Sequence, residues 1–206
     1  FDSYAENKSP DLMNPTGQAD VTFAEAGDWV RQHRDERFFL FAHTYQVHGP
    51  YSPPPQYAQL FTAQPDVPAA AAADSAAYDR EIRFTDDMLR KLFAAIRDTG
   101  LEERTIVVLT ADHGEEFLEH GCLGHGPDLY EEVTHVPLML RGPGVPSGRR
   151  VAEPVGGLDI LPTMLELAGI PVPSQAMGRS LVPALRTGHA EPDRMLSTEA
   201  WANGQC

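Results

Sequence analysis

The segment from Thr105 to Gly126 constrains the fold of this chain more than any other stretch. Its first part, residues 105–110, is uncharged and rich in β-branched side chains, which is typical of a short strand covered on both faces in a parallel sheet. Three histidines and four carboxylates follow in a loop that glycines interrupt. In open α/β sheets ligands bind at the carboxyl ends of strands, where a rigid strand holds the exposed side chains in place. The segment therefore predicts a strand with a metal site at its end.

The composition of the chain is that of an acidic globular protein. Its 206 residues are 42% hydrophobic and 22% charged, which is enough for one substantial core and excludes a chain that is disordered throughout. Lysine and arginine number 16 against 30 aspartates and glutamates, and the formal net charge of -14 argues against nucleic acid or an anionic membrane surface as the main partner. An anionic small substrate would need a local positive charge, which a divalent cation supplies. No apolar run approaches the roughly 20 residues of a membrane span.

Hydrophobic spacing predicts helices that alternate with strands. Apolar residues recur at helical intervals in residues 21–34, between residue 75 and Gly100, and in residues 158–168. Apolar runs predict buried strands at residues 38–42, 105–110 and 136–140. The order helix, strand, helix, strand, strand, helix predicts an α/β layer architecture.

Asp112 and His113 are the first candidate metal ligands. They follow the strand at 105–110 directly and offer one oxygen and one nitrogen donor, a mixture that suits divalent cations from calcium to zinc. The alternative is a surface aspartate next to a core histidine, since adjacent Asp-His pairs are common. The surrounding glycines, histidines and carboxylates favour the metal site.

Two further histidines are candidates for binding or proton transfer. His125 lies in a glycine-rich loop, where it could bind a metal, bind an anion or protonate a leaving group, whereas His120 is interpreted mostly as solvent exposed. His48 lies five residues after His43, on a loop whose prolines exclude regular structure. The rigid, exposed loop favours His48 as the acting residue and His43 as one that orients it.

Other chemically capable residues are interpreted as structural. Asp86 and Asp87 lie within the second predicted helix, where charged side chains usually face solvent. Cys122 could act as a nucleophile, but the sequence places no base beside it, and a small buried apolar role is favoured. No functional signal is carried by His33, His135 and His189.

An ordered series of motifs resembles the sulfatases of the alkaline phosphatase superfamily. It comprises Ala-Asp-His-Gly-Glu-Glu-Phe at 111–117, Gly-His-Gly at 124–126, Leu-Tyr-Glu-Glu at 129–132 and Thr-His-Val-Pro-Leu-Met-Leu-Arg-Gly-Pro-Gly at 134–144. Similar segments lie at 38–43, 47–54, 78–86, 157–169 and 178–181. The resemblance implies an alkaline phosphatase-like fold, with a central, mostly parallel sheet flanked by helices and incomplete here. It also implies that residues 1–206 are roughly the second half of the catalytic domain, truncated at both ends.

The resemblance assigns roles to four residues. Asp112 and His113 would be ligands of one divalent cation, usually calcium in this family. His113 stands where many members have Asn, and a nitrogen ligand leaves zinc, manganese or magnesium open. His48 would contact the sulfate or assist the leaving oxygen, and His125 would hold the sulfate and its leaving group, at a position where members carry Lys or His.

The nucleophile of the family is expected outside this chain. It is a formylglycine made from the Cys or Ser of a C/S-x-P-x-R motif, and the one P-x-R at that spacing, residues 190–194, has Ala at the reacting position. The resemblance therefore predicts a metal-dependent sulfuric ester hydrolase when full length, acting on a sulfate ester of a small molecule or glycan. The 206 residues alone are expected to be inactive.

Two further functions stay open from the sequence. A metal-dependent phosphohydrolase or phosphoethanolamine-type transferase of the same superfamily shares the Asp-His-Gly strand but uses a Thr or Ser nucleophile. A non-catalytic relative would keep the fold for binding or structure.

Overall fold

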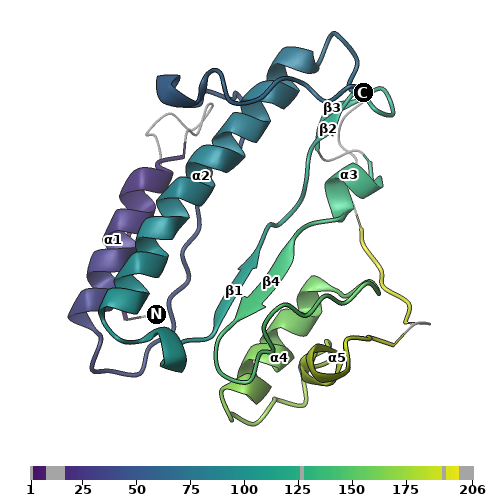
Figure 1. Cartoon of the computed structure of the whole chain (residues 1–206). Coiled ribbons are helices and arrows are strands. Elements are labelled where there is room, and N and C mark those ends of the chain that lie inside the picture. Colours follow the sequence, from purple (N-terminus) through teal and green to yellow (C-terminus); the bar gives the residue numbers. More distant parts are fainter. Residues whose placement is uncertain (1, 8–16, 126–127, 192–193, 200–206) are drawn as a thin grey trace. The chain divides into compact units, whose positions relative to one another are not determined.

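The structure is a computed structural model that describes residues 2–7, 17–125, 128–191 and 194–199 (Figure 1). The described residues form two compact units. The first contains the chain up to Leu101 together with Glu115–His125, and the second contains Glu102–Gly114 and the chain from residue 128 onward. Each unit has its own packed elements. Within the described residues no helix is long and apolar enough to cross a membrane.

Two helices form the core of the first unit. Helix α1 (Ala19–Gln32) lies along helix α2 (Ala72–Asp98), as Figure 1 shows. Every third or fourth side chain of α1 is buried, including Phe23 and Val30, which is the stripe that an amphipathic helix buries. The helix predicted at 21–34 and the one predicted from residue 75 to Gly100 are confirmed.

The apolar run at residues 38–42 does not form the strand that the sequence predicts. In the described part of the chain it belongs to no sheet, and Phe39 and Phe41 are 59% and 70% exposed. A strand is stabilised by hydrogen bonds to a neighbouring strand, so an apolar sequence pattern alone does not complete one. The strand prediction is wrong for this segment as the structure describes it.

A short hairpin completes the first unit. Strand β2 (Glu116–Phe117) pairs antiparallel with β3 (Leu123–Gly124), with Glu116 opposite Gly124. The buried Glu116 carboxylate secures the turn, because its Oε1 accepts hydrogen bonds from the backbone N–H groups of His120 (2.8 Å) and Cys122 (3.1 Å). The sequence predicts only a loop here, since two ladder pairs are too few for a recognisable strand pattern. The first unit also contains a 3₁₀ turn, η1 (Pro55–Tyr57).

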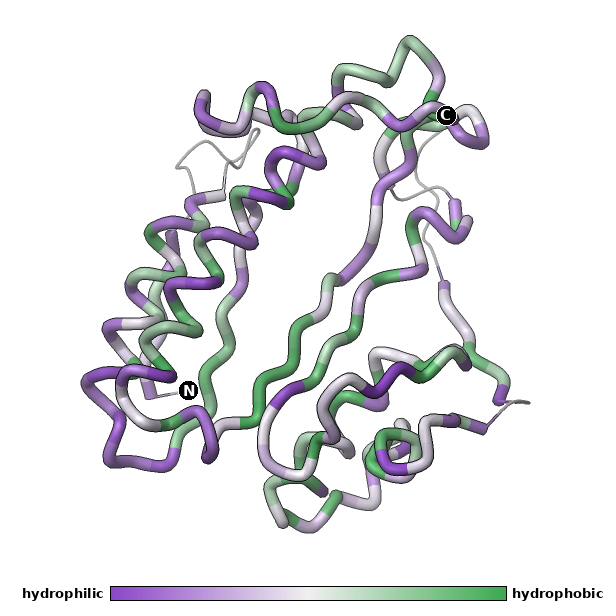
Figure 2. The backbone as a smooth tube through the Cα atoms, in the orientation of Figure 1, coloured by the Kyte–Doolittle hydropathy of each residue, from purple (hydrophilic) through white to green (hydrophobic). Residues whose placement is uncertain are grey.

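One antiparallel pair of strands lies in the second unit. Strand β1 (Val107–Thr110) pairs with β4 (Leu138–Arg141), with Thr110 opposite Leu138. Both strands appear as hydrophobic stretches in Figure 2. Strands are confirmed at both predicted segments, although β4 ends one residue later than predicted. The expected burial in a parallel sheet is not found in the described residues, because β1 has one antiparallel neighbour there and both strands are partly exposed. Their mutual direction is antiparallel because the chain re-enters the sheet at the end where it left.

Two helices, α4 (Ile160–Leu167) and α5 (Val182–Thr187), lie in the later part of the second unit. Helix α4 confirms the helix predicted at 158–168, and α5 packs against it. The short elements of this unit are η2 (Glu102–Arg104), α3 (Glu131–Thr134) and η3 (Gly157–Asp159).

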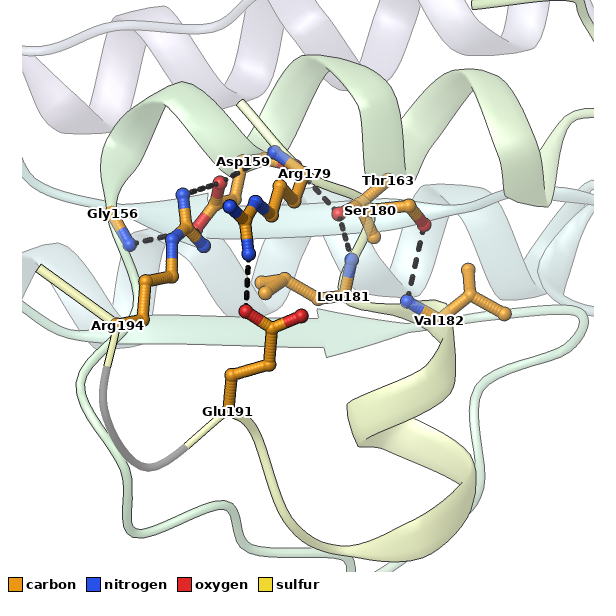
Figure 3. Close-up of polar contacts among 9 residues, drawn as sticks. All are labelled: Gly156, Asp159, Thr163, Arg179, Ser180, Leu181, Val182, Glu191 and Arg194. Carbon is orange, nitrogen blue, oxygen red and sulfur yellow. Dashed lines mark hydrogen bonds and ion pairs between the residues drawn. The ribbon is translucent and has the colours of Figure 1, made fainter. Parts of the chain in front are cut away.

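A buried carboxylate joins the segments around α4. Asp159 is fully buried, and its two oxygens accept hydrogen bonds from the guanidinium of Arg194 at 2.5 and 2.7 Å (Figure 3). The same carboxylate accepts the backbone N–H groups of Gly156 (2.9 Å) and Arg179 (2.8 Å). Burial acts to raise the pKa of Asp159, but Arg194 and the backbone donors outweigh it and hold that pKa below its ordinary value. The Asp159 side chain therefore caps its own turn through Gly156 and fixes two separate segments, at Arg179 and Arg194, to the start of α4.

Candidate active site

His48 and His125 lie side by side in the first unit. Their ring centroids are 5.6 Å apart with an interplanar angle of 74°. His48 lies on the loop that leads toward η1, and His125 directly follows β3. The structure thus brings together the two histidines that the resemblance assigns to the substrate.

The backbone carbonyl of the next residue fixes the position of the proton on His48. The Nδ1 atom of His48 lies 2.7 Å from the carbonyl oxygen of Gly49. Because a carbonyl oxygen only accepts hydrogen bonds, Nδ1 is the donor and carries a proton. The Nε2 atom is then the nitrogen of His48 that can face a ligand.

A glutamate holds His125 in the same way. The Nδ1 atom of His125 lies 2.8 Å from Oε1 of Glu115, whose side chain is 6% exposed. The other oxygen of Glu115 accepts a hydrogen bond from the hydroxyl of Tyr51. The ring of Tyr51 packs against the rings of Tyr78 and Phe117, with centroids 5.6 Å and 6.1 Å apart. Burial first, and then Glu115, raises the pKa of Tyr51, so the hydroxyl stays a protonated donor.

Helix α2 anchors the loop that carries His48 and Tyr51. The buried carboxylate of Glu81 accepts the backbone N–H of Ser52 at 2.7 Å. Gln46, also buried, accepts the N–H of Ala19 at the start of α1 at 3.3 Å. Burial raises the pKa of Glu81 to about 7, and the hydrogen bonds only partly offset it. The loop is therefore tied to both long helices.

Asp112 and His113 lie at the end of β1 in the second unit. Oδ2 of Asp112 and Nε2 of His113 are 3.8 Å apart, and the side chains are 75% and 36% exposed. Nδ1 of His113 lies 2.9 Å from the carbonyl oxygen of Gly114, so Nδ1 carries a proton and donates a hydrogen bond there, and Nε2 keeps its lone pair when the ring is neutral. Donor atoms each about 2.0–2.6 Å from a cation can span the observed separation. The two residues fit a shared divalent cation.

The strand end that carries this pair is fixed by α3. The N–H of Gly114 donates to the carbonyl oxygen of Val133 at 2.8 Å, and a side chain at Gly114 would meet the carbonyl oxygen of Glu132. Only glycine allows this close approach.

The residues interpreted as structural have structural environments. Asp87 accepts hydrogen bonds from Arg83 at 2.9 Å and from the hydroxyl of Tyr57 at 3.1 Å. Cys122 is buried, as expected, and His120 lies exposed at the hairpin turn.

Sequence reasoning missed Glu115 and Tyr51 as members of the site. The signal lies in the hairpin register: Glu116 opposes Gly124, so Glu115 and His125 form the next cross-strand position. A sequence interpretation that assigned this hairpin would have found the pair.

Comparison with known proteins supports the resemblance. The family model described as Sulfatase matches residues 2–170. Among curated relatives, the chain is similar to arylsulfatase K of Danio rerio, with 45% identity over 101 residues, which is 49% of this chain and 19% of that protein. The chain thus matches about a fifth of the length of this relative.

Solved structures share the fold. The sulfatase-type protein yidJ from Bacteroides fragilis aligns with a TM-score of 0.76 at 21% identity, over 85% of this chain and 42% of that chain. This structural similarity confirms the predicted alkaline phosphatase-like fold class.

Two other solved structures have lower TM-scores than yidJ but higher sequence identity to this chain. BT4656, solved in complex with its substrate D-glucosamine-2-N,6-O-disulfate, is 30% identical with a TM-score of 0.51, over 58% of this chain and 25% of that chain. The phosphonate monoester hydrolase of Silicibacter pomeroyi is 32% identical with a TM-score of 0.50, over 60% of this chain and 23% of that chain. Because the family model matches most of its length, the chain belongs to the sulfatase family.

Proposed function

We propose that the full-length protein hydrolyses sulfate esters to an alcohol and inorganic sulfate with the help of a divalent cation. The adjacent rings of His48 and His125, each with Nδ1 committed to an acceptor oxygen, are the observation that carries the proposal. Both rings therefore have Nε2 as the nitrogen for a substrate. When each ring also carries a proton on Nε2, the two imidazolium rings suit an anion with several oxygens, which a sulfate ester presents.

In the proposed reaction His48 and His125 stabilise charge at the ester. A protonated Nε2 donates a hydrogen bond to a sulfate oxygen or to the oxygen that leaves with the alcohol. Preorganised donors of this kind contribute on the order of 10²-fold or more to turnover each. We assign both histidines as catalytic and substrate-binding residues.

Asp112 and His113 would hold the cation. Members of the sulfatase family generally bind a divalent metal. Such a cation, when bound, supplies positive charge that neutralises sulfate oxygens and favours an ionised nucleophile. Calcium is the expected ion from the family resemblance, whereas the nitrogen donor of His113 also suits zinc or manganese, and magnesium is a further candidate.

The substrate class proposed is a sulfated small molecule or glycan. The curated relatives are arylsulfatases, and BT4656 was solved with a sulfated glucosamine. The nucleophile, a formylglycine, is proposed to come from a segment outside this chain, because the 206 residues contain no C/S-x-P-x-R motif.

A phosphorus ester is the second candidate substrate. The 32% identity to a phosphonate monoester hydrolase favours a phosphorus ester over a purely structural role for the chain. Sulfate and phosphonate monoesters share a tetrahedral anionic centre, so the two histidines would serve either.

Rates with three aryl esters test the proposal. The full-length protein is assayed with an aryl sulfate, an aryl phosphate and an aryl phosphonate monoester carrying the same leaving group. We expect the highest kcat/KM with the sulfate, because the family match is to sulfatases. A higher kcat/KM for either phosphorus ester would replace the proposal with the second candidate, and no turnover of any ester would favour a non-catalytic relative.

A further inference from the structure

We infer that Glu115 is a positioning residue that orients the ring of His125 for the reaction, and that Tyr51 holds Glu115 in place. The inference rests on the proposed function of His125. It follows from a series of contacts. Tyr51 packs against Tyr78 and Phe117 and donates to Glu115, and Glu115 accepts from Nδ1 of His125.

The hairpin places Glu115 and His125 opposite each other. The pairs Phe117–Leu123 and Glu116–Gly124 fix the register, and Glu115 with His125 is the next cross-strand position. Gly124 has φ +92°, a conformation that residues with side chains rarely adopt, and it turns the backbone just before His125. The backbone thus aims the histidine back at Glu115.

Because Glu115 is buried, its carboxylate depends on hydrogen bonds from neighbouring side chains. A carboxylate that is 6% exposed must receive hydrogen bonds to offset the loss of water. Its Oε1 accepts from Nδ1 of His125 and its Oε2 accepts from the hydroxyl of Tyr51. Since an ionised carboxylate only accepts, both partners are fixed as donors.

This arrangement selects one state of the histidine ring. A proton held at Nδ1 by Glu115 leaves Nε2 as the nitrogen that faces the substrate, and the 2.8 Å contact fixes the ring plane. Carboxylate partners that orient metal-binding histidines cost about 10–100-fold in affinity or activity when they are lost, and we expect an effect of that order for a histidine that binds substrate. The ring of Tyr51 packs against Tyr78 and Phe117, and its hydroxyl donates to Glu115.

A double-mutant cycle tests the role of Glu115 in the full-length protein. Glu115→Gln keeps the shape but removes the charge, and we expect kcat to fall at least about 10-fold. If Glu115 acts through His125, then Glu115→Gln in a His125→Ala background changes kcat by less than about twofold. Equal losses of kcat in both backgrounds would overturn the inference, because replacing a residue with a merely structural role lowers kcat whether or not His125 is present.

A matched control separates this role from a general effect of losing a histidine–carboxylate pair. Glu131 forms such a pair with His135 at 3.1 Å, but both side chains are mostly exposed. We expect Glu131→Gln to leave kcat within about twofold of the parent. Metal content is measured for every variant by elemental analysis, and a loss in Glu115→Gln alone would contradict a role through His125.

Nitrogen-15 NMR of the histidine side chains gives a readout that needs no turnover. In the parent protein we expect a proton on Nδ1 of His125, and in Glu115→Gln a mixture of ring states, whereas a parent ring without a proton on Nδ1 overturns the inference. If the parent protein prefers a phosphorus ester, the proposed function is wrong. The double-mutant cycle of Glu115 and His125 is then measured with that ester and still tests the inference. If it turns over no ester, the NMR result alone decides the inference.

Discussion

Glu81 is a buried carboxylate whose surroundings oppose its charge. It is 2% exposed on α2, its Oε1 accepts the N–H of Ser52, and its Oε2 has no hydrogen-bond partner in the described part of the protein. Burial raises its pKa from 4.5 to about 7. The folded protein therefore retains a proton on Glu81 at pH values at which the unfolded chain has released it.

Replacement of Glu81 is expected to change how stability depends on pH. Because the folded pKa is raised, the contribution of Glu81 to stability is full below about pH 4.5 and is lost as the pH rises to about 7. Glu81→Gln removes this loss, so the variant should gain up to about 3 kcal/mol relative to the parent between pH 4 and pH 8. Urea denaturation of the full-length protein at both pH values measures the difference.

The control for Glu81→Gln is Glu36→Gln, at an exposed position after α1. We expect the same stability difference from the parent at both pH values for this control. A pH-independent difference for Glu81→Gln would show that its carboxyl group titrates as in the unfolded chain.

At the scale of elements, the contact between the end of β1 and α3 holds the proposed metal ligands. Gly114 donates its N–H to Val133, and an added Cβ at Gly114 would lie 2.0 Å from the carbonyl oxygen of Glu132. Real Cβ atoms essentially never approach that closely, so the backbone of α3 or of the strand end must move.

Gly114→Ala is therefore expected to weaken metal binding through geometry alone. We expect a loss of about 1–3 kcal/mol in stability, typical of forced overpacking, together with a lower affinity for the cation. Thermal denaturation and metal titration of the full-length protein measure the two effects. Gly157→Ala is the control, because a Cβ there meets nothing within 4 Å and its φ is not positive; an equal loss in both variants would refute the steric explanation.

The elements differ in how far the sequence predicts them. Helices α1 and α2 were predictable because their hydrogen bonds join residues four apart and their buried stripes repeat every three to four residues. Residues 38–42 have a strand-like pattern but lie in no sheet among the described residues. The β2–β3 hairpin was missed because each strand has two residues and one of them is the buried Glu116. Strand formation depends on a partner, and the local sequence does not specify one.

At the scale of the whole molecule, the chain is strongly acidic and its proposed substrate is an anion. The net charge of -14 opposes the approach of a sulfate ester, so a bound cation would be the local source of attraction. The proposed ligands are acidic or neutral, and the cation would stabilise the folded protein as any ligand specific to that state does.

Metal removal should therefore lower both stability and activity of the full-length protein. We expect a chelator to lower the Tm and abolish most ester hydrolysis, and Asp112→Ala to reduce metal content and activity together. Once metal is lost, chelator should shift the Tm of Asp112→Ala much less than that of the parent. Asp35→Ala, at a side chain that is 90% exposed, is the control that keeps metal and activity. Unchanged metal content in Asp112→Ala would disprove the assignment of this ligand.

The sequence by itself determined the family, the long helices, and the placement of Asp112 and His113 at the end of a strand. These features depend on neighbours in the chain, so periodicity and motif order encode them. Only the tertiary structure decided that His48 faces His125, that Glu115 and Tyr51 support that ring, and that β1 and β4 run antiparallel. Those contacts join residues far apart in sequence through hairpin register and side-chain packing, which no local pattern specifies.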